Sequence, residues 1–115
     1  MSKLNEDKVN NEIVIDFNQL RNPELRESFL SAFGHMIKGL LGSIFGPNEP
    51  PRTRIMGKPA EVHAFAQALK DEGSYIRTLQ KYDLDNPRTH KNKAKLKNSV
   101  KKFENETGVK WPFAT

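Results

Sequence analysis

The chain has 115 residues, no cysteine and a formal net charge of +5 at pH 7. Its length limits it to one compact domain with tails, and the lack of cysteine excludes a disulfide framework and thiolate metal sites. Residues 1–50 carry five Lys/Arg against seven Asp/Glu, whereas residues 51–115 carry fourteen against seven. The basic half is therefore expected to face an anionic partner, which could be nucleic acid, phospholipid or an acidic protein surface.

Residues 1–11 are polar and show no hydrophobic periodicity, which predicts a disordered lead. They also lack the cationic start and apolar segment of a secretory signal. We therefore expect a cytoplasmic protein, or a virion protein if a phage encodes it.

Residues 12–17, EIVIDF, alternate between apolar side chains and others, a pattern typical of a half-buried strand. No second convincing strand follows in the sequence. The segment either adds to the sheet of another chain or packs in extended form against the helices, and we favour the second interpretation.

A long helix is predicted over residues 23–45, with Asn22 as its N-cap and Pro23 in its first turn. It is expected to stop at Gly46-Pro47, so residues 12–46 form the first segment of the fold. Within the helix, residues 29–45 carry a broad apolar face and an opposite face of small residues. The large apolar residues that could make contacts there are Phe29, Leu30, Phe33, Ile37, Leu40, Leu41, Ile44 and Phe45.

Three interpretations of residues 29–45 remain open: a core helix, a helix that associates with another copy or a protein partner, and a helix in peripheral contact with a membrane surface. The stretch FLSAFGHMIKGLLGSIF resembles short membrane-active peptides in its apolar face and glycines, although it lacks their several cations. Its 17 residues span about 25 Å as a helix, less than the ~30 Å of a bilayer core. A transmembrane span is therefore not expected.

Residues 47–56 contain three prolines and predict an extended linker before a basic helical region over residues 57–115. In that region, helices are predicted over 59–72, 74–82 and 88–107, with breaks at Gly73 and Gly108. The apolar tail around Trp111 is expected to fold back onto the helices.

The expected fold is mostly α: a small bundle of three to four helices with an extended N-terminal segment and a folded-back tail. We expect one core formed by Phe33, Ile37, Leu40, Phe65, Leu69, Phe103 and Trp111.

Six lysines within residues 91–102 form the strongest functional pattern in the chain. A lysine-coated helix supplies affinity for phosphate without base specificity. The alternative is a merely solvated helix face. The candidate nucleic-acid-binding residues are Arg88, Lys91, Lys93, Lys95, Lys97, Lys101 and Lys102.

Catalytic patterns are missing from the sequence. His35, His63 and His90 have no metal-ligand spacing, and no phosphate-binding glycine loop or nucleophile motif is present. We therefore expect a non-enzymatic binding or structural protein with no cofactor, no metal and no small-molecule substrate.

The segments GKPAEVHAFAQALKDEGSYI, NPRT and ETGVKWPF of the C-terminal half resemble small phage-encoded proteins. This resemblance implies a virion or accessory component. It supports the alternative function, an assembly or membrane-active structural component organised by residues 29–45.

Overall fold

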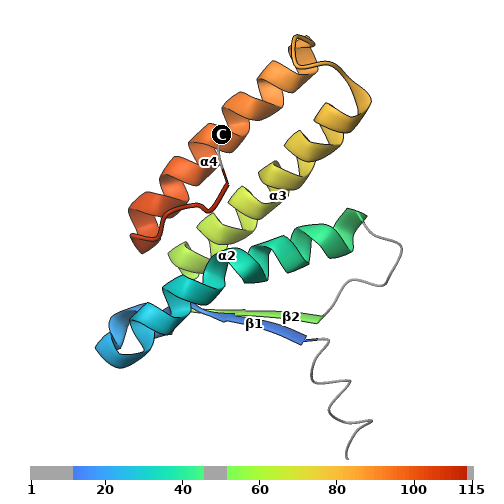
Figure 1. Cartoon of the computed structure of the whole chain (residues 1–115). Coiled ribbons are helices and arrows are strands. Elements are labelled where there is room, and N and C mark those ends of the chain that lie inside the picture. Colours follow the sequence, from blue (N-terminus) through green and yellow to red (C-terminus); the bar gives the residue numbers. More distant parts are fainter. Residues whose placement is uncertain (1–11, 46–51, 114–115) are drawn as a thin grey trace, which may run out of the picture. The chain divides into compact units, whose positions relative to one another are not determined.

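The computed structural model describes residues 12–45 and 52–113, and it confirms the predicted mostly helical class. Residues 1–11 and the expected helix stop at Gly46 lie outside this described part. The chain divides into two compact units, residues 1–58 and 59–115. The described elements are β1 (Glu12–Asp16), the 3₁₀ helix η1 (Phe17–Arg21), α2 (Pro23–Phe45), β2 (Arg52–Met56), α3 (Pro59–Lys81) and α4 (Pro87–Thr107), shown in Figure 1.

In the first unit, β1 and β2 pair in parallel, with Ile15 opposite Ile55. The expectation that the first strand has no partner within the chain is therefore wrong. Parallel neighbours need a long crossover, which η1 and α2 supply. The expected linker over 47–56 is also corrected, because its last five residues are β2; residues 47–51 are not described. β2 escaped prediction because it is short, and its first three residues are exposed.

Helix α2 begins as predicted. The Asn22 side-chain oxygen accepts a hydrogen bond from the Glu24 backbone N–H at 2.9 Å, so it caps the first turn. Phe29 and Phe33 lie one turn apart and pack against Phe17 of η1, with the three ring centroids 5.5–6.0 Å from one another. This aromatic cluster is fully buried and forms the core of the unit together with Ile15 and Ile37.

Helix α3 is one continuous helix, not the two that the sequence predicted over 59–72 and 74–82. Gly73 lies inside it and is buried, yet a β-carbon placed there would meet no atom within 4 Å. A glycine costs a helix about 1 kcal/mol relative to alanine, which the packing of α3 against α4 outweighs. Ser74 lies within the helix and does not begin a new one, and its carbonyl accepts a hydrogen bond from the Thr78 hydroxyl at 2.7 Å.

The second unit is the antiparallel pair α3–α4, closed by the C-terminal tail (Figure 1). Asn86 caps α4, and Gly108 ends it with a φ of 75°, in the left-handed region that glycine favours. The tail folds back as predicted. The Trp111 ring lies 5.3 Å from Phe103 and 6.2 Å from Phe65, centroid to centroid.

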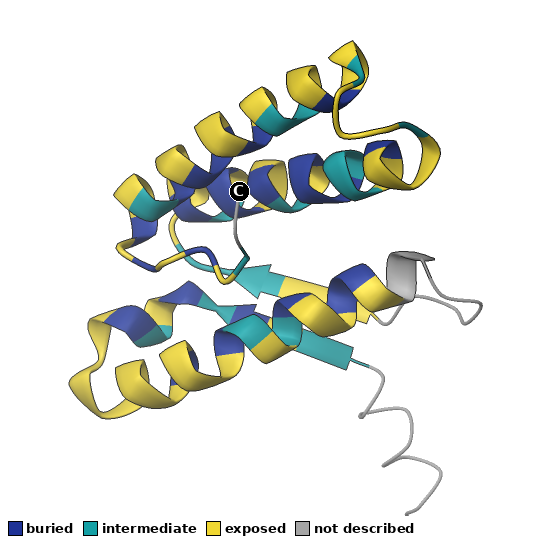
Figure 2. Ribbon diagram, turned by 45° about the horizontal axis from the view of Figure 1, so that its top comes forward, coloured by how far each residue is buried: buried dark blue, intermediate teal, exposed yellow. Residues whose placement is uncertain are grey.

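The predicted core residues fall in both units, with Phe33, Ile37 and Leu40 in the first and Phe65, Leu69, Phe103 and Trp111 in the second. Figure 2 shows buried residues along the facing sides of α3 and α4 and exposed residues along their outer sides. Leu69 is half-buried. The six buried members of the predicted core are Phe33, Ile37, Leu40, Phe65, Phe103 and Trp111.

Candidate nucleic-acid interface

The cations of α4 lie on two flanks of the helix, because its buried stripe, which includes Leu96 and Phe103, occupies the side towards α3. At 100° per residue, the cations on either side of this stripe fall into two separate rows. The first row, the groove flank, contains Arg88, Lys91, Lys95 and Lys102; the second, the outer flank, contains Lys93, Lys97 and Lys101. All seven are exposed except Lys93, which is half-buried.

No exposed acid lies among these cations on α3, or on α4 before Glu104. The three acids of α3, Glu61, Asp71 and Glu72, are all buried, with exposed fractions of 4–8%. Helix α4 contains no acid before Glu104. None of the α4 lysines forms an ion pair with another residue in the described ranges. The exposed charges along residues 62–81 and 87–103 are therefore all positive.

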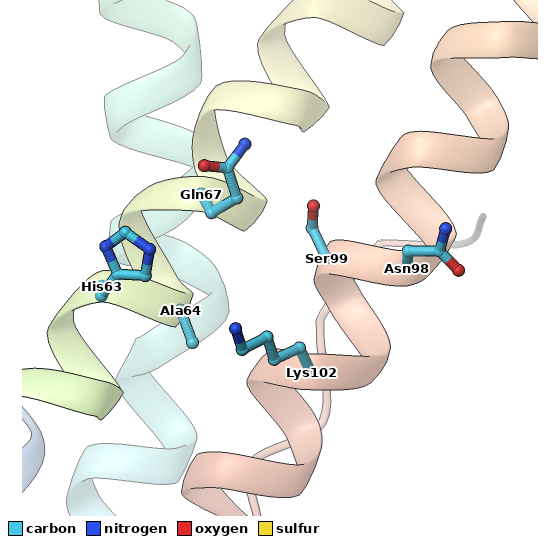
Figure 3. A pocket seen from close by; sticks show the side chains of 6 residues that line it. All are labelled: His63, Ala64, Gln67, Asn98, Ser99 and Lys102. Atoms are coloured by element: carbon cyan, nitrogen blue, oxygen red, sulfur yellow. The ribbon is translucent and has the colours of Figure 1, made fainter.

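A polar groove runs between α3 and α4. It consists of two adjoining hollows of about 170 and 390 Å³, which share Gln67, Asn98 and Ser99 in their lining. Figure 3 shows the smaller hollow, with His63, Ala64 and Gln67 on α3 and Lys102 extending from α4 towards α3. The larger hollow continues along the pair and is lined by Gln67, Lys70, Asp71, Ser74, Asn92, Lys95, Asn98 and Ser99.

Asp71 forms a buried hydrogen-bonded centre beneath the groove. The Ser99 hydroxyl donates to one carboxylate oxygen of Asp71, and this bond joins α4 to α3. The Gln67 side-chain amide lies 3.3 Å from both carboxylate oxygens. Helix α3 thus supplies a charged acceptor that is held in place by one hydroxyl and one amide.

The tail occupies a different side of the helix pair. The Trp111 indole N–H donates to Glu72 Oε1 at 2.8 Å, and the Trp111 backbone N–H donates to Glu104 Oε2 at 2.9 Å. Burial raises the pKa of the Glu72 carboxyl above its ordinary value, and the hydrogen bond from Trp111 lowers it by a smaller amount. Glu72 and Gln67 are five residues apart, about 140° around α3, so the tail leaves the groove open.

The apolar face of α2, the other predicted contact surface, is largely covered in the chain. Leu30 is 39% exposed. The side chains of Ile44 and Phe45 lie outside the described residues. The small-residue face opposite is exposed, and a β-carbon at Gly42 would meet nothing within 4 Å. The buried candidates are Phe29, Phe33, Ile37, Leu40 and Leu41.

Prediction from the sequence found the α4 cations but missed the α3 side of the groove. His63, Gln67, Lys70 and Ser74 recur at i, i+4, i+7 and i+11, which places them on one side of a continuous helix. The sequence predicted that the helix ends near Gly73, and this predicted break divided the repeat between two helices. A search for polar side chains at the helical spacing that reveals apolar stripes would have identified it.

Within the described ranges, no group of three His, Cys, Asp or Glu residues is arranged to hold a metal ion. No helix in that part of the chain is long and apolar enough to cross a membrane. The chain matches no known protein-family model, and no similar characterised protein or solved structure was found.

Proposed function

We propose that this protein binds a polyanion, nucleic acid in particular, through the cationic surface of α3 and α4. One observation carries the proposal: every exposed charge along residues 62–81 and 87–103 is positive, because the acids of α3 are buried and α4 has none before Glu104. A solvated helix face usually mixes both signs of charge. Lysine pairs with phosphate as a point charge, without the fixed geometry that arginine imposes.

The expected binding is electrostatic and strongly dependent on salt. Each phosphate contact with a cation releases counterions, so the logarithm of the affinity falls linearly with the logarithm of the salt concentration, by about 0.7–0.9 per contact. The two flanks of α4 allow several such contacts. We expect measurable binding at about 50 mM salt and a steep loss by about 200 mM.

Fluorescence anisotropy with labelled DNA across a salt series tests this proposal. Changing Lys95→Glu and Lys101→Glu reverses one charge on each flank and should weaken binding by about tenfold or more. The matched control is Lys38→Glu with Arg52→Glu, two exposed cations of the other unit, which changes the net charge equally. Absent binding at low salt, binding that ignores salt, or equal losses in both variants would contradict the proposal.

A further inference from the structure

The groove between α3 and α4 has an uneven distribution of charge. Its edges carry Lys70 on one helix and Lys95 and Lys102 on the other, and all three are exposed. Beneath them lies the buried Asp71 carboxylate, bonded to Ser99. A phosphate is attracted to the edges and repelled from the bottom of the groove. The ligand that fits should therefore be anionic on its outside and carry hydrogen-bond donors on the part that enters.

We propose that the groove holds a base of single-stranded nucleic acid, with the flanking phosphates on the three lysines. This inference rests on the proposed function and specifies its ligand. An ionised carboxylate only accepts hydrogen bonds and has about four acceptor positions. Ser99 and Gln67 do not use all of them at Asp71, so an exocyclic amino group of a base can donate to this carboxylate.

The other polar groups of the groove also suit an unpaired base. The side-chain amides of Gln67 and Asn98 are exposed at its edges, and an amide both donates and accepts hydrogen bonds. The residues that line the larger hollow include no Phe, Tyr, Trp or His ring. Recognition therefore relies on hydrogen bonds to the base edge, which is paired and hidden in a duplex but accessible in a single strand.

The dimensions of the groove agree with this ligand. The larger hollow, at about 390 Å³, falls within the ~300–1,000 Å³ range of small-ligand pockets. Residues His63 to Ser74, which line the two hollows on α3, cover about 16 Å of helix. This length accommodates a short stretch of one strand, and Lys102 and Lys95 lie towards opposite ends of it.

Competition between three labelled DNAs of about 15 nucleotides tests the inference: oligo(dC), oligo(dT) and a mixed-sequence duplex. Cytosine carries an exocyclic amino group and thymine does not. We expect oligo(dC) to bind about tenfold more tightly than oligo(dT), which is the effect of one hydrogen bond to a charged group. The duplex should be the weakest ligand.

Two matched pairs of substitutions on α4 locate the site. Lys95→Ala with Lys102→Ala removes two cations of the groove flank, and Lys97→Ala with Lys101→Ala removes two of the outer flank. The first pair should reduce the affinity for oligo(dC) by about tenfold and remove the preference for a single strand. The second pair should keep that preference. Equal effects of the two pairs would overturn the inference.

Asp71→Asn tests the bottom of the groove. It should make the affinities for oligo(dC) and oligo(dT) about equal, because the charged acceptor is lost. Binding of oligo(dT) should not weaken. Trp111 fluorescence reports whether the Asp71→Asn variant is folded. If it is unfolded, the inference is decided by the binding of the three DNAs to the native protein and by the two pairs of lysine substitutions. Equal binding of all three DNAs by the native protein overturns the groove inference but leaves the proposed function in place. No binding of any DNA at about 50 mM salt overturns both.

Discussion

At the scale of single residues, Glu72 and Trp111 show how the second unit closes. Glu72 is 4% exposed, and its carboxylate accepts the indole N–H of the only tryptophan in the chain. The same ring packs against Phe65 and Phe103. One side chain thus joins the tail to both helices through an apolar ring and one hydrogen bond. The Glu72 carboxyl is nevertheless buried, and burial disfavours its charged form.

Glu72→Gln should make the protein more stable at pH 7. The folded state holds the Glu72 proton more tightly than the unfolded chain does, because burial raises its pKa above the ordinary 4.5. The contribution of Glu72 to the stability therefore falls as pH rises from below 4.5 through the raised pKa. Glutamine can still accept from Trp111 and carries no charge.

Urea unfolding followed by Trp111 fluorescence at several pH values measures this effect. The stability advantage of Glu72→Gln over the native chain should shrink as pH falls and disappear well below 4.5, where Glu72 is protonated in both the folded and the unfolded state. The exposed Glu106, changed to Gln, serves as the control and should show no such trend. A Glu72→Gln variant no more stable than the native chain at neutral pH would refute this account.

Two glycines should respond to alanine in opposite directions. Gly73 lies inside α3 with open space where a β-carbon would stand, so Gly73→Ala should stabilise the protein by about 0.5–1 kcal/mol. Gly108 has a φ of 75°, so Gly108→Ala should destabilise it by about 1 kcal/mol. Thermal unfolding of the two variants compares them directly. Destabilisation by Gly73→Ala would show that the helix needs a glycine there.

At the scale of elements, the beginnings of the helices depend on local side-chain caps. Asn86 accepts a hydrogen bond from the Arg88 backbone N–H at 2.9 Å, and Pro87 follows in the first turn. The Thr89 hydroxyl donates to the Asp83 carbonyl at 2.8 Å and secures the preceding turn. These bonds are formed within a few residues, which explains why the start of α4 could be predicted to within one residue.

Asn86→Ala should lower the free energy of unfolding by about 1 kcal/mol, because it leaves a backbone donor of the first helical turn without its cap. Asn105→Ala is the matched control, since Asn105 is exposed near the other end of the same helix. Chemical denaturation of both variants gives the difference. Equal stabilities would mean that the cap contributes nothing.

At the scale of the whole molecule, the division after Lys58 separates two units that each have an aromatic cluster. Every residue of the proposed interface lies in the second unit. That unit also contains the buried acids of α3, which leave the exposed charges along residues 62–81 and 87–103 positive. The proposed binding surface and the core that supports it therefore belong to one stretch of 57 residues, 59–115.

The fragment 59–115 should consequently fold and bind DNA by itself. We expect a helical circular dichroism spectrum, a cooperative thermal transition and a Trp111 emission shifted to the blue. Its midpoint should lie below that of the full chain, because a domain of about 60 residues buries a small share of its surface. Lysine substitutions that weaken the full chain should weaken the fragment equally. A fragment without a cooperative transition would show that the second unit depends on the first.

The sequence by itself determined the helical class, the start of α2, both ends of α4 to within one residue, and the lysine positions. These features depend on caps, glycines and periodicities within a few residues of one another. Only the tertiary structure decided the partner of β1, the continuity of α3 through Gly73, and the groove that joins Lys70 to Lys95. Each of these depends on contacts between residues far apart in the chain. Such contacts outweigh local preferences, and the sequence of one partner alone does not show which segment it contacts.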